Sequence, residues 1–158
     1  MDDFLEGMRR LAAAVDVVTV ADGDRRGGLT ASAVTSLTVD PPMLLACVNR
    51  SASSHALIVD AGRFAVNVLP AGDQGVAAAF AGMTGLEGDD RFSVGEWREG
   101  DLGQPILTTA LVSFECVIES LVGRSTHDIV IGEVQAVHLG EKTDPLLYMD
   151  RSFGTFAP

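Results

Sequence analysis

The sequence predicts a mainly β fold, a closed or nearly closed antiparallel barrel with short peripheral helices. Its 158 residues suit one compact domain. Short runs rich in β-branched residues recur along most of the chain, and glycine, proline and aspartate separate them. Helical spacing is confined to short segments, so the alternation of strand and helix that builds a parallel sheet is not sustained. A closed antiparallel barrel leaves no exposed strand edges, which favours this architecture.

The first third of the chain predicts one helix and several extended segments. Residues 3–14 carry apolar side chains at helical spacing, and residues 15–21 (VDVVTVA) are β-branched and predict a strand. Residues 27–39 begin with glycines and continue as a run of serine, threonine and alanine. Asp40-Pro41-Pro42 ends any regular structure, and residues 43–49 (MLLACVN) then predict a buried strand.

The middle of the chain predicts two short helices and a strand. Residues 51–61 predict a helix with a serine near its N-cap, and residues 63–69 alternate as a strand that Pro70 ends. Residues 73–82 are rich in alanine and predict the second helix. Residues 83–105 are rich in glycine and acidic residues and predict a long surface excursion, which in a compact domain is often functional.

Two long strands dominate the C-terminal third. Residues 110–122 and 128–139 alternate, and residues 123–126 connect them. One face of the first run is only partly apolar, whereas the other is cleaner and carries Val112, Phe114, Cys116 and Ile118. Residues 145–149 predict a last strand, and residues 150–158 form a tail.

The composition excludes several classes of protein. The formal net charge is −11 at pH 7, and Lys142 is the only lysine. The clustered positive charge that binds nucleic-acid phosphates is therefore missing from the sequence. No apolar stretch reaches the ~20 residues of a membrane span, and the N-terminus lacks the apolar core of a signal peptide. We expect a cytoplasmic protein that binds neither nucleic acid nor membrane.

The cysteines and histidines do not predict a metal centre. Cys47 and Cys116 each lie inside an apolar run and predict buried free thiols. His55, His127 and His138 are scattered, without the close spacing that metal ligands need. The same spacing gives no ground for a Ser–His–Asp or Cys–His catalytic arrangement.

The segment from Gly28 to Ser36 (GLTASAVTS) is the first candidate site. Small side chains let a flat ring approach the backbone closely, and N–H groups and hydroxyls can bond the oxygens and nitrogens of the ring. The same composition also suits an ordinary surface strand of a barrel.

The segment from Asn49 to His55 (NRSASSH) is the second candidate site. An arginine and three serines at the start of a helix form a suitable place for a phosphate. They equally suit a plain capping sequence with a solvated arginine. The segment lacks the glycine pattern of a P-loop or of a dinucleotide-binding turn.

Two further segments carry weaker signals. His127 starts a strand after the 123–126 loop, and alone it is more typical of a surface or hydrogen-bonded histidine than of a functional one. The tail at 150–156 pairs an arginine with aromatic residues, and it could order against a ligand or fray.

Seven blocks taken together resemble the short-chain flavin reductase family, whose fold is the FMN-binding split barrel, a Greek-key antiparallel barrel. The resemblance runs from about Met8 to Phe156, so a single domain over 1–158 is expected. The blocks, in order, are VVTV at 17–20, GLTASAVTSLTVDPP at 28–42, NRSASSH at 49–55, RFAVNVL at 63–69, DRF at 90–92, HDIVIGEV at 127–134 and PLLYMDRSFG at 145–154.

The resemblance implies an NAD(P)H:flavin oxidoreductase, which transfers hydride from NADH or NADPH to FMN or FAD. It implies a homodimer that supplies reduced flavin by diffusion to a separate monooxygenase. A non-catalytic split-barrel module that holds flavin or haem is the alternative. A split-barrel enzyme that oxidises a pyridoxine phosphate needs several arginines and lysines around the substrate phosphate, and the single lysine and few clustered arginines of this sequence count against it.

The resemblance also implies a role for each matched position. The isoalloxazine edge would be lined by Thr30, Ser32, Ala33, Val34 and Thr35. The ribityl chain and phosphate would be held by Asn49, Arg50, Ser51, Ala52, Ser53, Ser54 and His55. Gly82, Met83 and Phe92 would close over the flavin, His127 would act beside the nicotinamide, and Arg151, Ser152 and Phe153 would contact the pyridine nucleotide.

Two positions depart from the family pattern. The Gly-Asp that precedes the histidine in the family is Ser125-Thr126 here, and the Thr-Gly-Val before the first strand is Ala14-Val15-Asp16.

Overall fold

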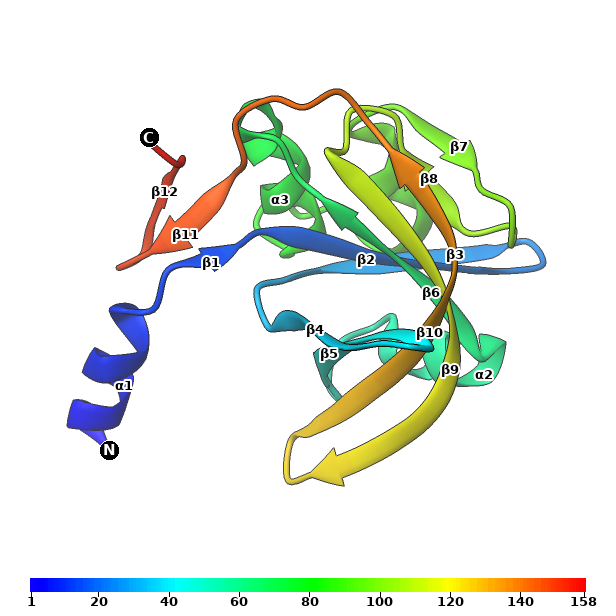
Figure 1. Cartoon of the computed structure of the whole chain (residues 1–158), viewed down its shortest axis with the longest axis horizontal. Helices are drawn as coiled ribbons and strands as arrows, with labels where there is room; N and C mark the ends of the chain where they lie inside the picture. Colours follow the sequence, from blue (N-terminus) through cyan, green and yellow to red (C-terminus); the bar gives the residue numbers. More distant parts are fainter.

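Twelve β-strands, three α-helices and two 3-10 helices make up the chain in the computed structural model, which describes residues 1–158 (Figure 1). Seven strands form the main sheet in the order β3-β2-β6-β9-β10-β5-β4, and every neighbouring pair is antiparallel. They are β2 (Asp16–Asp22), β3 (Arg25–Ala31), β4 (Val34–Val39), β5 (Pro42–Asn49), β6 (Arg63–Val68), β9 (Val112–Arg124) and β10 (His127–Leu139).

The main sheet curls until its two edges meet. β3 and β4 lie at opposite edges of the sheet, yet only Ser32 and Ala33 separate them along the chain. The N–H of Cys47 in β5 donates to the carbonyl of Ala33 at 2.9 Å, which fixes this link against the far edge. The predicted mainly β antiparallel barrel is therefore confirmed.

Alternate residues of the strands fill the barrel. A Cβ at position 132 would lie 2.7 Å from the Phe64 ring and 2.8 Å from the Cβ of Cys116, so Gly132 gives Phe64 room at the centre. The buried residues of this core are Val18, Val20, Ala31, Leu44, Ala46, Val48, Leu57, Ile58, Phe64, Val66, Cys116 and Val130.

A second apolar core lies on the other face of β2, since Val17 belongs to it whereas Val18 belongs to the barrel. Phe80, Phe92 and Trp97 pack there with ring centroids 5.0–5.2 Å apart. The elements that contribute to this core include α3 (Gln74–Phe80), η2 (Gly88–Ser93), β7 (Trp97–Glu99) and β8 (Pro105–Leu107). The short η1 (Ala71–Asp73) precedes α3 and has no buried residue.

Most residues of the segment 83–105 are exposed, as predicted for a surface excursion, but Phe92, Val94 and Trp97 pack on the second core. The Arg91 guanidinium donates to the carbonyls of Leu86, Gly28 and Phe80 at 3.1–3.3 Å, which ties η2 to β3 and α3. Gly28 is also needed for the packing, because a Cβ there would lie 2.9 Å from the Phe80 ring. The excursion is therefore anchored to the domain by a few aromatic side chains and by Arg91, while most of its polar residues stay exposed.

The N-terminal helix differs from its prediction. α1 (Asp2–Arg9) has no buried residue and lies beside the barrel, at the left of Figure 1. The helix prediction was wrong for residues 10–14, because β1 (Ala13–Ala14) pairs instead with β11 (Leu147–Met149). β12 (Ser152–Gly154) completes this small sheet, so part of the tail is ordered as a hairpin.

The helix predicted at residues 51–61 begins later than expected. α2 (His55–Ala61) starts after a turn at 51–54, and Ser54 at its N-cap position makes no side-chain cap hydrogen bond. None of the helices is long and apolar enough to cross a membrane.

Both cysteines are free thiols, as predicted. The predicted burial is confirmed for Cys116 but was wrong for Cys47, which is half-buried because its position in β5 faces outward. Burial raises the pKa of the Cys116 thiol to about 12, which leaves it protonated and unreactive at neutral pH.

Asp16, one of the positions that depart from the family pattern, is buried in β2. The residue is 3% exposed, and its carboxyl group accepts no hydrogen bond within the chain. Desolvation raises the pKa of this carboxyl to about 7, so the folded protein retains a proton that the unfolded chain loses near pH 4.

We predict that Asp16→Asn removes a pH dependence of stability. The native carboxyl contributes most to stability below pH 4, and that contribution falls by about 1.4 kcal/mol per pH unit as the pH rises to about 7. Urea unfolding of both proteins at pH 5 and pH 8 should show the variant gaining relative stability at the higher pH. A stability difference that is the same at both pH values would contradict the burial argument.

Candidate functional site

The strand register brings two predicted site segments to one outer face of the barrel. In β5 the buried residues Ala46 and Val48 alternate with the half-buried Cys47 and Asn49, which face outward. Asn49 lies directly opposite His127 in β10, so both side chains leave the sheet on this outer face. With Ala33 bonded to Cys47, these positions form a continuous line, which we call the outer stripe (Ala33, Cys47, Asn49 and His127).

Two cavities lie next to the Ala33 end of the outer stripe, and both are lined by Ser32 and Tyr148. The larger, about 630 Å³, lies between α1, the Ser32-Ala33 link and Arg151. The smaller, about 210 Å³, lies against β3 and α3. Small-molecule sites typically measure roughly 300–1,000 Å³. The predicted site residues that line these cavities are Thr30, Ser32, Ala33, Met83, Arg151 and Phe153.

The Ser32-Ala33 link offers free hydrogen-bond donors to the cavities. It lies outside both strands, and neither of its backbone N–H groups donates within the chain. The Ser32 and Thr35 side chains are exposed, whereas the Thr30 hydroxyl donates to the carbonyl of Ala77 at 2.7 Å and joins β3 to α3. Val34 is half-buried against the barrel core.

The turn that follows β5 is shaped by Asn49. Its side-chain oxygen accepts bonds from the N–H and the hydroxyl of Ser51, both at 2.9 Å, and its carbonyl accepts the N–H of Ala52. The N–H groups of Ser53 and Ser54 donate to nothing in the chain, and the Ser53 side chain is exposed. The Ser54 hydroxyl is fully buried without a partner, so it does not reach the surface of the turn.

Arg50 and His55, both predicted to hold phosphate, bind the same carboxylate. The Arg50 guanidinium donates through Nε and Nη2 to Oδ1 of Asp128, at 3.1 and 2.8 Å, and through Nη1 to the carbonyl of Ser125. The Nε2 of His55 lies 2.6 Å from Oδ2. Hydrogen bonds from Arg50 and then His55 lower the pKa of Asp128. We call these three residues the Asp128 network.

His127 is the first residue of β10, directly after the hairpin turn, and is exposed. Its Nδ1 lies 2.8 Å from the hydroxyl of Thr126. Ser125 has φ of 50°, in the left-handed region that favours glycine. A glycine, as in the family pattern, would adopt this backbone without strain, and here a serine adopts it.

Three further predicted positions line neither cavity and lie outside the 49–55 turn and the outer stripe. Phe92 is 7% exposed and belongs to the second core, where the Arg26 guanidinium covers its ring at 4.4 Å. Gly82 lies in the turn after α3, beside Arg91, with φ of 76°. Ser152 is exposed in β12, with its hydroxyl 3.5 Å from the carbonyl of Asp150.

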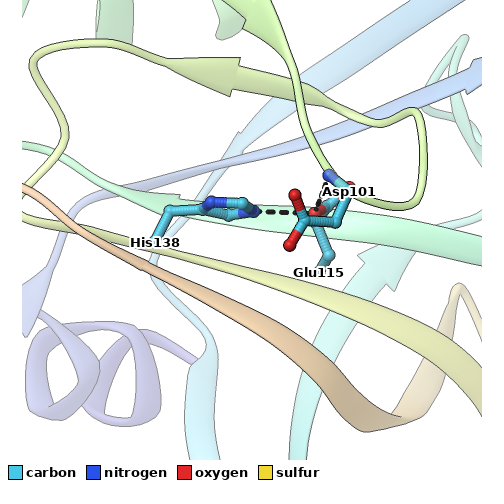
Figure 2. Close-up of side chains that lie close together, drawn as sticks. All are labelled: Asp101, Glu115 and His138. Carbon is cyan, nitrogen blue, oxygen red and sulfur yellow. Dashed lines mark hydrogen bonds and ion pairs between the residues drawn. The ribbon is translucent and has the colours of Figure 1, made fainter.

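A cluster of metal-ligand types lies elsewhere, beneath the excursion. Asp101, Glu115 and His138 have ligand atoms within 4.8 Å of one another (Figure 2). The fully buried Glu115 already accepts the N–H groups of Asp101, Leu102 and Gln104, at 2.7–3.2 Å, and lies 2.7 Å from Nε2 of His138. Its oxygens are therefore engaged in anchoring the 100–104 loop.

Comparisons with known proteins agree with the resemblance seen in the sequence. A family model described as a flavin reductase like domain matches residues 8–157. FMN reductase (NADH) RutF of Variovorax paradoxus (strain S110) is 40% identical over 155 residues, 98% of this chain and 85% of that protein.

Solved structures match over the whole chain. BorF, the flavin reductase component of a bacterial two-component tryptophan halogenase, has a TM-score of 0.90 at 31% identity, with 100% of this chain and 99% of that chain covered. The NADH:FAD oxidoreductase SgcE6 of Streptomyces globisporus C-1027, in complex with NAD and FAD fragments, has a TM-score of 0.90 at 31% identity, with 99% and 93% covered.

We predict that Glu115→Gln strongly destabilises the fold. An amide group offers fewer acceptor sites than a carboxylate, so buried N–H groups lose their partner at a cost of about 3 kcal/mol. Glu119→Gln is the matched control, because Glu119 is exposed on the same strand. Urea unfolding should show a large loss at position 115 and little change at 119, and equal effects would contradict the anchoring role.

Proposed function

Because the chain belongs to the flavin reductase-like domain family, we propose that it is an NADH-dependent flavin reductase that passes hydride to FMN or FAD. The main structural support for this proposal is the outer stripe. It joins the residues expected to hold flavin to the histidine expected beside the nicotinamide. The relatives' names support NADH as the donor, with FMN as acceptor in one and FAD in another. We also propose that residues 1–158 form one domain.

The residues around the cavities fit a flat heterocyclic ring. Ser32 and Ala33 have small side chains and present two unused N–H donors beside the larger cavity. We assign these donors and the Thr35 side chain to the ring edge, where fixed donors can stabilise negative charge. The free N–H groups of Ser53 and Ser54, together with the Ser53 hydroxyl, suit the terminal phosphate.

The chain's own part in the reaction is binding and orientation. Flavin and nicotinamide supply the hydride chemistry when bound, and no protein nucleophile is needed. His127 is exposed beside Asn49 and can bond the nicotinamide nucleotide, while Arg151 and Phe153 line the cavities from the tail. These side chains hold the flavin and the nicotinamide nucleotide in a fixed relative orientation. The entropy cost of bringing two free molecules into that orientation is then met by binding, which lowers the barrier to hydride transfer.

We propose further that reduced flavin leaves for a separate oxygenase. BorF, a reductase component of a two-component system, supports this role. Both cavities are open to solvent, and the ring donors are backbone groups without charge, so exchange of flavin is easy. The two free cysteines agree with a cytoplasmic location.

We predict that NADH oxidation by the purified protein requires added FMN or FAD. His127→Ala should raise the KM for NADH by about tenfold, the loss of one hydrogen bond to a charged group, with a smaller effect on the KM for flavin. Steady-state kinetics with each substrate varied in turn measure both. Flavin binding without any turnover would favour the non-catalytic binding module instead, and equal effects on both KM values would make His127 structural.

The exposed apolar surface supports a homodimer. Phe4, Leu5, Met8 and Leu11 on and after α1 are 48–65% exposed, and Val39 at the end of β4 is 90% exposed. Apolar surface of this extent commonly marks a protein interface. α1 also forms one wall of the larger cavity, so a second copy that covers it would complete the site.

We predict a dimer in sedimentation velocity at micromolar concentration. Leu5→Glu with Met8→Glu should shift it to monomer and weaken flavin binding, because charged groups resist burial at an interface. The pair Asp2→Gln with Asp3→Gln changes the same helix without placing charge on its apolar side chains and serves as the control. A monomeric native protein would contradict the interface.

A further inference from the structure

The Asp128 network holds Arg50 at several points. Besides the bonds to Asp128 and Ser125, the backbone N–H of Arg50 donates to the carbonyl of Thr126 at 2.9 Å. A Cβ at position 123 would overlap Nη2 of Arg50, so Gly123 makes room for the guanidinium to lie on the β9–β10 hairpin. The guanidinium of Arg50 is thus held against the β9–β10 hairpin.

The carboxylate of this network is close to saturated. Asp128 is 8% exposed; Oδ1 takes both Arg50 bonds and Oδ2 faces His55. Its lowered pKa keeps it ionised at neutral pH, where it balances the charge of Arg50. Beside the 49–54 turn, the positive charge expected from the sequence is therefore cancelled within the chain.

The donors left at the turn are neutral. They are the N–H groups of Ser53 and Ser54 and the exposed Ser53 side chain, since the Ser54 hydroxyl is buried. A phosphate at this turn would meet dipoles but no net charge. Charge-assisted hydrogen bonds are roughly twice as strong as neutral ones, so the contribution of a phosphate to affinity would be small.

We propose that Asp128 is a specificity-determining residue that limits how tightly the terminal phosphate of a flavin is held, because it neutralises Arg50. The proposal rests on the proposed function, in which the 49–54 turn receives that phosphate. It follows that the native protein discriminates only weakly between FMN and riboflavin, which lacks the phosphate. Weak retention of the phosphate agrees with a flavin that must leave after reduction.

The test compares the native protein with Asp128→Asn, Arg50→Gln and the double variant. For each protein, the Kd of riboflavin and the Kd of FMN are measured by fluorescence titration without NADH, and the ratio of riboflavin Kd to FMN Kd is compared. Asp128→Asn leaves Arg50 unbalanced and should raise the ratio about fivefold, the effect of one exposed ion pair. Arg50→Gln leaves Asp128 unbalanced and should lower it. The double variant restores balance and should return the ratio close to the native value.

The double variant separates this proposal from direct binding of phosphate by Arg50. If Arg50 were itself a phosphate ligand in the native protein, the double variant would match Arg50→Gln, because removing Asp128 cannot replace a lost ligand. That result overturns the proposal, as does an Asp128→Asn variant that leaves the ratio unchanged. The double variant buries no unpaired charge, so it remains informative even where Asp128→Asn fails to fold.

Asp89→Asn is the matched control. Asp89 in η2 pairs with Arg26 in β3 at 2.6 Å. Asp89→Asn therefore makes the same change of charge as Asp128→Asn and also leaves an arginine without its carboxylate. Its ratio should equal that of the native protein, and a rise there would show a general charge effect and refute the local one. A native protein that binds neither flavin would instead reject the proposed function, a result distinct from all of these.

Discussion

The closure of the barrel through the Ser32-Ala33 link is the constraint on which the site depends. Because β3 and β4 are opposite edges of one sheet, the two residues that join them belong to neither ladder. Ala33 gives its carbonyl to Cys47, but the two N–H groups of the link stay unused. Exposed backbone donors next to small side chains and a cavity of about 630 Å³ are thus a direct result of the topology. The site needs no glycine-rich nucleotide loop.

Two buried carboxylates stabilise the segments around this barrel, and each does so by accepting several hydrogen bonds. Glu115 gathers three backbone N–H groups and fixes the loop that returns the excursion to β8. Asp128 gathers Arg50 and His55 and fixes the turn after β5 to the hairpin that carries His127. Buried charge is tolerated at both places because its partners are complete. The second network also decides which charges a ligand meets at the turn.

The sequence predicts the strands well because their signal is local. Runs such as 15–21 and 63–69 are β-branched or alternate, so each indicates a strand by itself. The strand register, which places Asn49 opposite His127, is not visible in such local patterns. The buried polar networks could not be predicted in this way. Asp128 stands next to His127 in the chain, but its partners lie 73 and 78 positions away, and only the fold brings them together. Phe92, expected over the flavin, packs into the second core because Phe80 and Trp97 meet it there; its contact with ligand stays a prediction.

The most direct test of the account is a single turnover without oxygen, in which the protein with bound FMN is mixed with NADH and the visible absorbance of the flavin is followed. The account predicts complete bleaching in one step that slows when the transferred hydrogen at C4 of NADH is deuterium, because hydride passes directly between two nucleotides oriented by the outer stripe. Absorbance that stays unchanged while both nucleotides bind would contradict the account, since it would mean that the stripe and its cavities hold ligands without bringing their reacting atoms together.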